Sequence, residues 1–223
     1  AEVVHTATLL HDDVIDGAEV RRDGAAANRR FGNTVAILAG DALLSDVMFQ
    51  LATHGHPELL MSLCGVLKDA CRGEGLQHEL IWRIPPSLGP YLRVMELKTA
   101  SLFRWCGSVG LTLARHPARD AARAYLGKLG LLFQISDDLL DVVGTDSKER
   151  WMDLREGRLN AVTWRLVHAE PDLRARVEAS FSQRRPDHGL TWAFEDHPRL
   201  PAAVADTRRA MRWLAGEAER DLA

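Results

Sequence analysis

Two short clusters of aspartates have the clearest chemical potential in this sequence. They read Asp12-Asp13-Val14-Ile15-Asp16 and Asp137-Asp138-Leu139-Leu140-Asp141, and both lie inside apolar, helix-patterned segments. Side chains four residues apart share one face of a helix, so each cluster gathers like charges on one face. Aspartate is also a poor residue for a helix interior, and a like-charged pair costs a further ~0.2–0.5 kcal/mol. Because these placements oppose local stability, the pattern predicts bound cations rather than two solvated surface patches.

The predicted cation is Mg²⁺. Carboxylate oxygens are hard ligands, and Mg²⁺ in proteins is usually bound by one or two carboxylates together with the phosphates of a substrate. Two groups of carboxylates with metal ions between them would bind a diphosphate. The ions would neutralise the charge that develops on a departing diphosphate. All six aspartates, Asp12, Asp13, Asp16, Asp137, Asp138 and Asp141, are therefore candidate metal residues.

Helices must position both clusters, because helical periodicity dominates the chain and strand-like alternation is rare. The pattern predicts one helix at 2–22 that carries the first cluster and another at about 120–143 that carries the second. A turn or loop is expected at 23–33, and the prolines at 84–90 predict a break. Further helices are predicted at 34–54, 57–77, 91–114, 158–180 and 200–222. With no repeat and no linker, residues 1–223 read as a single all-α domain.

Composition excludes several other classes of protein. The 223 residues suffice for one sizeable core, and a net charge of −3 argues against a basic face that binds nucleic acid. Three cysteines without metal-ligand spacing suit reduced thiols, so a cytoplasmic location is expected. No uninterrupted apolar run reaches the ~18 residues of a membrane span, so no transmembrane segment is expected. The first residue is not methionine, so N-terminal helices are expected to be missing.

Several further motifs flank the two aspartate clusters. They are Arg21-Arg22 after the first cluster, Lys98-Thr99 between the clusters, Phe133-Gln134 just before the second, and Asp153-Leu154-Arg155-Glu156-Gly157 after it. Together with the segment from His5 to Asp16, they resemble the trans-polyprenyl diphosphate synthase family. The resemblance covers the chain from Ala1 to about Gly157 and is weak beyond it. It implies an all-α helical bundle of the isoprenoid synthase type with a central active-site cavity.

The resemblance also implies a role for individual residues. Asp12, Asp16 and Asp137 would bind Mg²⁺ with an allylic prenyl diphosphate, and with Lys98 they form the expected catalytic set. The other three aspartates would support these ligands. Arg21 corresponds to a contact with the allylic diphosphate, and Arg22 to a contact with isopentenyl diphosphate. The remaining expected substrate contacts are Lys98, Thr99, Gln134 and Lys148.

Two segments depart from the family pattern. The Gly-Lys-Pro of the family is Ser147-Lys148-Glu149 here, and its Thr-Leu-Pro is replaced at 159–162. One turn before Asp12, Ala7 and Thr8 stand where short-chain members carry a bulky aromatic residue. Because these side chains are small, the resemblance predicts an open cavity floor and a product longer than geranylgeranyl.

The activity implied is condensation of an allylic diphosphate with isopentenyl diphosphate by a homodimeric enzyme. Two alternatives stay open at this point. A non-catalytic or regulatory subunit of a heteromeric synthase would fit the altered loop and the absence of the family's upstream Gly-Lys and Arg. A class I terpene cyclase shares the first aspartate motif, although it usually carries an Asn/Asp, Ser, Glu triad in place of a second cluster.

Overall fold

The computed structural model describes residues 1–21, 24–144, 150–185 and 188–222, and nearly all regular structure in these ranges is helical. The expected all-α class is therefore confirmed. The chain divides into two compact units, Ala1–Cys64 and Gly65–Ala223, and the boundary falls within helix α4. The expectation of a single domain over 1–223 stays a prediction.

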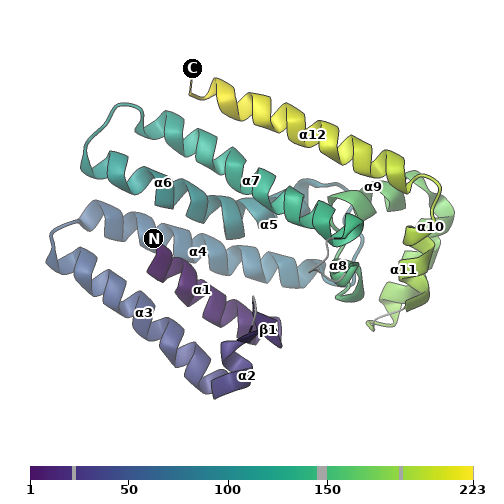
Figure 1. Ribbon diagram of the computed structural model, residues 1–223, viewed down its shortest axis with the longest axis horizontal. Helices are drawn as coiled ribbons and strands as arrows, with labels where there is room; N and C mark the ends of the chain where they lie inside the picture. Colours follow the sequence, from purple (N-terminus) through teal and green to yellow (C-terminus); the bar gives the residue numbers. More distant parts are fainter. Residues whose placement is uncertain (22–23, 145–149, 186–187, 223) are drawn as a thin grey trace. The chain divides into compact units, whose positions relative to one another are not determined.

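The first unit is built on two packed helices (Figure 1). Helix α1 (Glu2–Ile15) runs along α3 (Asn33–Thr53), and α4 (Pro57–Leu80) begins in this unit. Val4 and Ala7 are completely buried and lie on the same stripe of α1 as His11. The His11 ring approaches the carbonyl oxygen of Ile37 at 3.2 Å, and a Cβ atom at Gly40 would lie 2.5 Å from that ring. The absence of a side chain at Gly40 therefore lets α1 and α3 meet closely.

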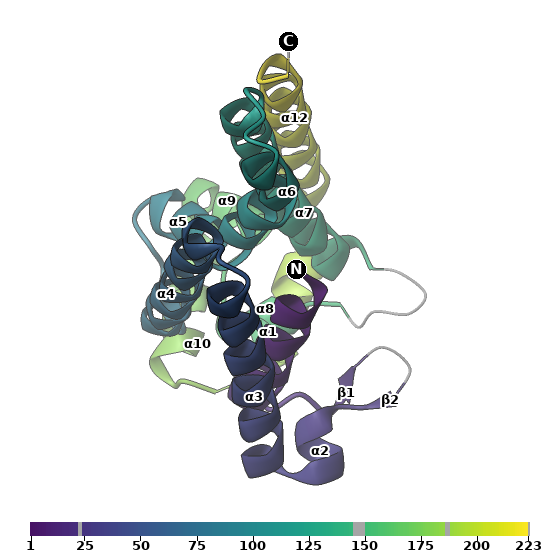
Figure 2. The same cartoon turned by 90° about the vertical axis from the view of Figure 1, so that its left-hand side faces the viewer.

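The predicted helix at 2–22 is wrong beyond Ile15. Asp16 is the C-cap of α1, and Gly17 takes a positive φ of 62° that helical residues do not adopt. Strand β1 (Val20–Arg21) then pairs with β2 (Gly24–Ala25) in an antiparallel hairpin, visible in Figure 2. The loop predicted at 23–33 is also wrong in part, because it contains β2 and the short helix α2 (Ala27–Phe31).

Helix α3 confirms the helix predicted at 34–54 and has an unusual surface. Its length and composition would allow it to cross a membrane, with a mean hydropathy of 1.6 in its most apolar window, of which 11% is buried. A single helix of this kind is weak support for a membrane span. Val35, Leu38 and Phe49 lie on one face of α3 and are each more than half exposed.

The second unit is a set of long helices followed by a group of shorter ones. Helices α5 (Gly89–Met95) and α6 (Ser101–Leu113) are joined by a π-helical turn, η1 (Glu96–Ala100). Helix α7 (Arg119–Val143) packs against η1, α6 and the last helix α12 (Leu200–Arg220). Figure 2 shows α7 beside α6 and α12. The predicted helices at 57–77, 91–114, 120–143 and 200–222 and the break at 84–90 are confirmed within a few residues at their ends.

The helix predicted at 158–180 is divided. Helix α9 (Ala161–Ala169) ends at Glu170, because Pro171 starts α10 (Pro171–Ser182) and a proline cannot continue the preceding hydrogen-bond ladder. The connection that follows contains a further helix, α11 (His188–Glu195). With α8 (Met152–Arg155), these helices enclose a core that includes Trp151, Leu166, Phe181 and Phe194.

Candidate functional site

The first aspartate cluster lies at the C-terminal end of α1. The backbone N–H of Asp16 donates to the Asp12 carbonyl oxygen at 2.8 Å, so the helical turn still relates these two residues. Asp12 is half-buried and Asp16 is exposed. The expected pairing of Asp12 and Asp16 on one face therefore holds in the structure.

Asp13 points elsewhere and is only 2% exposed. Its Oδ1 accepts hydrogen bonds from Arg21, whose Nε lies at 2.6 Å and whose Nη2 lies at 2.5 Å. The side chain of Asn28 donates to the Asp13 carbonyl oxygen at 2.9 Å. Asp13 thus fixes the β1 hairpin and the Arg21 guanidinium, and its own role as a metal residue stays a prediction. Arg22 lies outside the described residues.

The two residues expected to set product length differ in their surroundings. Ala7 is completely buried on the α1 stripe that contacts α3. Thr8 is half-buried and donates to the His5 carbonyl oxygen at 2.9 Å. At about 100° per residue, Thr8 lies about 40° from Asp12 around the helix axis, and Ala7 lies about 140° away. The helix geometry therefore brings Thr8, and not Ala7, to the side of α1 that carries Asp12.

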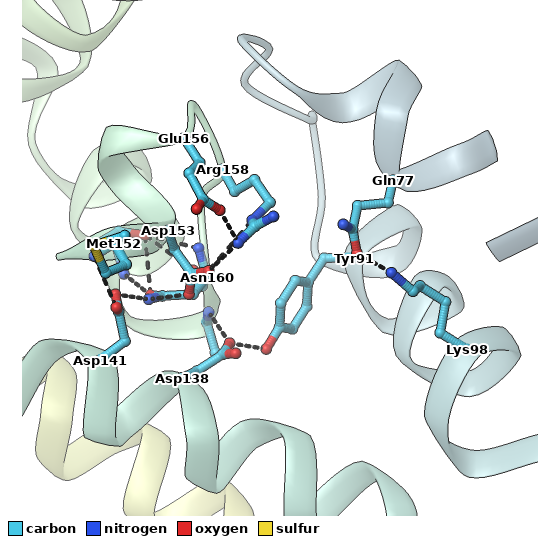
Figure 3. A network of polar contacts seen from close by, with 12 residues as sticks. Gln77, Tyr91, Lys98, Asp138, Asp141, Met152, Asp153, Glu156, Arg158 and Asn160 are labelled. Carbon is cyan, nitrogen blue, oxygen red and sulfur yellow. Dashed lines mark hydrogen bonds and ion pairs between the residues drawn. The ribbon is translucent and has the colours of Figure 1, made fainter. Parts of the chain in front are cut away.

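Lys98 lies in the π-helical turn η1 of the second unit. Its Nζ forms an ion pair with Glu74 of α4 and donates to Gln77 Oε1 of the same helix at 3.2 Å. Figure 3 shows the contact with Gln77. A Cβ atom at Gly73 would lie 2.7 Å from Lys98 Cγ, so a glycine at 73 allows α4 and η1 to approach. Turns of π-helix often occur at functional sites, because the extra residue turns side chains out of the regular helical phase.

Thr99, the neighbour of Lys98, connects η1 to the second aspartate cluster. Its Oγ1 donates to Gln134 Oε1 on α7 at 3.1 Å. The two elements meet at Gly130, where a Cβ atom would lie 2.7 Å from Ala100 Cα. Asp137, one turn beyond Gln134, is exposed. The structure therefore joins Thr99 to Gln134 across the η1–α7 contact, while Lys98 on η1 is directed at α4 and Asp137 lies one turn beyond Gln134 on α7.

The other two aspartates of the second cluster are buried and hydrogen-bonded. Asp138 accepts from the Tyr91 hydroxyl and from the Ala161 backbone N–H at 3.0 Å. Asp141 Oδ1 accepts from the Met152 backbone N–H at 2.8 Å. Figure 3 shows both carboxylates directed at the segment from α8 to the start of α9. Asp138 and Asp141 therefore hold that segment, and their roles as metal residues stay predictions.

Burial shifts the protonation of the Tyr91–Asp138 pair. Removal from water, with the charge of Asp153 nearby, raises the pKa of the Asp138 carboxyl well above its ordinary value, although the hydrogen bond from Tyr91 opposes this. Burial and the adjacent Asp138 also raise the pKa of the Tyr91 hydroxyl well above its ordinary value. A protonated Asp138 would bind to Tyr91 without burying a charge.

This shift predicts a pH-dependent stability. As pH rises above the ordinary aspartate pKa of about 4, the unfolded chain releases a proton that folded Asp138 retains. The free energy of unfolding should then fall by up to about 1.4 kcal/mol per pH unit until the raised pKa of Asp138 is passed. Asp138→Asn should flatten this dependence, which urea unfolding in a metal chelator between pH 4 and 8 would measure. Parallel curves for the two proteins would contradict the shift.

The carboxylates suit Mg²⁺ that is bound together with the phosphates of a substrate. Among the described residues, no three His, Cys, Asp or Glu side chains gather closely enough to enclose a metal ion. Mg²⁺ does not need such an enclosure, since one or two carboxylates and substrate phosphates satisfy it. Asp12 and Asp16 supply a pair of this kind in the first unit, and Asp137 supplies an exposed carboxylate in the second.

Some residues of this site were missed by the sequence analysis. Glu74 and Gln77 are polar residues one turn apart in the second half of α4, a spacing that could have indicated a common partner. Tyr91 and Asn160 gave no signal, because their partners are distant in the chain. Lys148, a predicted substrate contact, lies outside the described residues.

Comparison with known proteins agrees with these motifs. A family model described as Polyprenyl synthetase matches residues 1–194. A mitochondrial solanesyl-diphosphate synthase of Oryza sativa subsp. japonica is 36% identical over 186 residues, which cover 81% of this chain and 43% of the relative. Component 2 of a heptaprenyl diphosphate synthase of Geobacillus stearothermophilus is 34% identical over 191 residues, covering 83% of this chain and 58% of the relative. The chain spans about half the length of the curated relatives it matches.

Solved structures extend the similarity to the C-terminal helices. A polyprenyl synthase of Caulobacter crescentus, complexed with calcium and isoprenyl diphosphate, aligns with a TM-score of 0.88 and 29% identity over 99% of this chain and 69% of that one. A decaprenyl diphosphate synthase of Rhodobacter capsulatus aligns with a TM-score of 0.81 and 29% identity over 99% and 76% of the two chains. The fold is therefore that of the all-α isoprenoid synthases, and the chain belongs to the polyprenyl synthetase family.

Proposed function

We propose that this protein is a Mg²⁺-dependent trans-prenyltransferase that condenses an allylic prenyl diphosphate with isopentenyl diphosphate into a long-chain polyprenyl diphosphate. The observation that carries the proposal is the η1–α7 contact, where Thr99, the neighbour of Lys98 in the chain, bonds to Gln134, one turn before Asp137, at 3.1 Å. A cation, a hydroxyl, an amide and a carboxylate on one contact suit a metal-bound diphosphate. Relatives named as solanesyl diphosphate synthases support a long-chain synthase over a regulatory subunit or a terpene cyclase.

The reaction follows from what these residues can bind. Mg²⁺, when bound, neutralises the charge of the leaving diphosphate. Asp12 and Asp16 of the first unit and Asp137 of the second would hold the metal ions, and Lys98 and Thr99 would donate to the diphosphate oxygens. The allylic C–O bond breaks, and the double bond of isopentenyl diphosphate attacks the resulting cation. A proton then leaves to the released diphosphate, so no side-chain nucleophile is required. An apolar, dry cavity would keep water from the cation.

A primer series tests the proposed activity. The full-length protein, with Mg²⁺ and radiolabelled isopentenyl diphosphate, is incubated separately with dimethylallyl, geranyl, farnesyl and geranylgeranyl diphosphates. The expected result is label in products longer than geranylgeranyl, and none when Mg²⁺ is removed by a chelator. Label confined to farnesyl or geranylgeranyl diphosphate would contradict long-chain synthesis, and no incorporation from any primer would contradict the activity itself.

The positions of Ala7 and Thr8 lead to a prediction about product length. Thr8→Phe should shorten the product, because residue 8 lies on the side of α1 that carries Asp12. Ala7→Phe should instead destabilise the protein, since overpacking a filled interface costs about 1–3 kcal/mol. Product chromatography and thermal unfolding separate the two effects. Shortening by Ala7→Phe with an unchanged melting temperature would restore the original assignment of Ala7.

The exposed apolar face of α3 supports the homodimer expected from the family. Val35, Leu38 and Phe49 expose 51%, 61% and 66% of their surfaces in the single chain. A face of this kind marks a contact with another protein surface. Light scattering of the full-length protein should give twice the monomer mass, and Leu38→Asp should shift it towards monomer. A wild type that is monomeric at all concentrations would contradict the dimer.

A further inference from the structure

The start of α9 is organised by the side chain of Asn160, which is 2% exposed. Its Oδ1 accepts from the backbone N–H groups of Val162 and Thr163 at 3.2 Å and 3.1 Å. In return, the Asn160 backbone N–H donates to Thr163 Oγ1 at 2.9 Å. These contacts form a capping box, which satisfies backbone donors that a helix start leaves without partners.

The other end of the same side chain contacts two acidic residues. Asn160 Nδ2 lies 3.2 Å from Asp153 Oδ2 and 3.5 Å from Asp141 Oδ2, as Figure 3 shows. Asp141 is 3% exposed, and Asp153 is less buried and also accepts from Arg158 at 3.2 Å through its other oxygen, so Asn160 brings a buried carboxylate and a partly exposed one to the same amide group. A carboxamide can cap the helix through its oxygen while both of its amide hydrogens bind carboxylates. Aspartate can only cap, and threonine has a single hydroxyl hydrogen.

These contacts also determine the orientation of the last turns of α7. Asp138 is fixed by the Ala161 backbone N–H, the residue directly after Asn160. Asp141, one turn along, is fixed by the Met152 backbone N–H and approached by Asn160. Attachment of both buried aspartates to the α8–α9 segment opposes rotation of the end of α7, and Asp137 remains on the exposed side of the cluster.

We propose that Asn160 is a positioning residue for the second aspartate cluster. By joining Asp141 and Asp153 to the start of α9, it holds Asp137 in the direction from which that residue binds a metal–diphosphate group. The inference rests on the proposed function only for the identity of that group. Residues that orient metal ligands typically change metal affinity by about 10–100-fold when mutated.

Asn160 has two roles to separate: its amide group contacts Asp141 and Asp153 (the bridge), and its oxygen caps α9 (the cap). Two variants of Asn160 separate them. Asn160→Thr and Asn160→Asp both retain a capping oxygen, and both lose the amide that bridges the carboxylates. Calorimetric titration of inorganic diphosphate in the presence of Mg²⁺ should show affinity lowered about 10-fold in both. Thr163→Val is the matched control, because it removes the other half of the capping box and leaves the bridge. It should lower the melting temperature by about 2–4 °C without changing diphosphate affinity.

A second measurement decides the inference without any ligand. In a metal chelator, Asn160→Thr should lower the melting temperature by about 2–4 °C in the wild-type background. In an Asp153→Asn background, where no carboxylate pair remains to be bridged, Asn160→Thr should lower the melting temperature by less than half as much. Equal shifts in the two backgrounds would overturn the bridge. Wild-type affinity in both Asn160 variants would overturn the positioning role. A wild type that binds no diphosphate would overturn the proposed function alone, because the thermal comparison still tests Asn160.

Discussion

Replacing Asp137 by alanine is expected to lower kcat by at least about 10²-fold, the scale of losing a major electrostatic stabiliser of a transition state. Asp12→Ala should have an effect of the same size. The reason is that Asp12 and Asp137 offer carboxylates outside the buried set, whereas Asp13, Asp138 and Asp141 are buried within the protein. Steady-state kinetics with an allylic primer and saturating Mg²⁺ would measure the loss.

The same variants should fold normally. Because Asp137 is exposed, its removal should change the free energy of unfolding by only about 0.5 kcal/mol. Asp120→Ala is a suitable control, since Asp120 lies on the same helix with a side chain that is 81% exposed. It should retain full activity. Near-normal turnover of both Asp12→Ala and Asp137→Ala would remove the basis of the metal assignment.

Lys98→Met is expected to lower kcat/KM for the allylic substrate by about 10²-fold, because it removes a charged donor from the proposed diphosphate site. The side chain is only 22% exposed and is held by Glu74 and Gln77, so the ammonium is placed before substrate arrives. Methionine keeps the length and the packing of the lysine stem. Kinetics at varied allylic diphosphate, with KM and kcat resolved, would measure the effect.

Two comparisons make this result specific. Lys68→Met removes an exposed lysine from α4, the helix that also supplies Glu74, and should leave the kinetics unchanged. Glu74→Gln should weaken the hold on Lys98 and raise KM less than Lys98→Met does. Equal kinetics for Lys98→Met and Lys68→Met would show that Lys98 does not bind the diphosphate.

The sequence was sufficient to predict the helices whose apolar periodicity is long and uninterrupted. The helix predicted at 120–143 is observed with nearly the expected ends, because its buried positions repeat the same helical phase, and the helix predicted at 34–54 is observed because its apolar run is long. The error at 2–22 arose from a single positive φ at Gly17, followed by a hairpin of only two residues per strand. A glycine in a charged segment is compatible with either the continuation or the end of a helix, because tertiary contacts decide between them.

For the candidate site too, the sequence predicted some relations between residues and could not predict others. Spacing alone related Asp12 to Asp16 and Gln134 to Asp137, since each pair lies on one helical face. Spacing could not show that Asp138 faces Tyr91 or that Asp13 faces Arg21, because those partners come from other elements. The direction in which each aspartate side chain of a cluster points depends on which carboxylates have hydrogen-bond donors on neighbouring helices. That information is absent from the local sequence.

The π-helical turn at Glu96–Ala100 also bears on how this helix could tolerate change. The backbone N–H of Ser101 bonds to the Glu96 carbonyl oxygen, five residues back, so the turn holds one more residue than an α-helical turn. Deleting one residue between 96 and 100 would remove the extra residue and restore regular winding, with little change in the rotation of α5 relative to α6. Tyr91 before the turn could then keep its contact with Asp138, and Gly107 beyond the turn its close approach to Leu126. The residues within the turn, Lys98 and Thr99 among them, would change direction, so a one-residue deletion should damage the diphosphate contacts proposed for them more than it damages the fold.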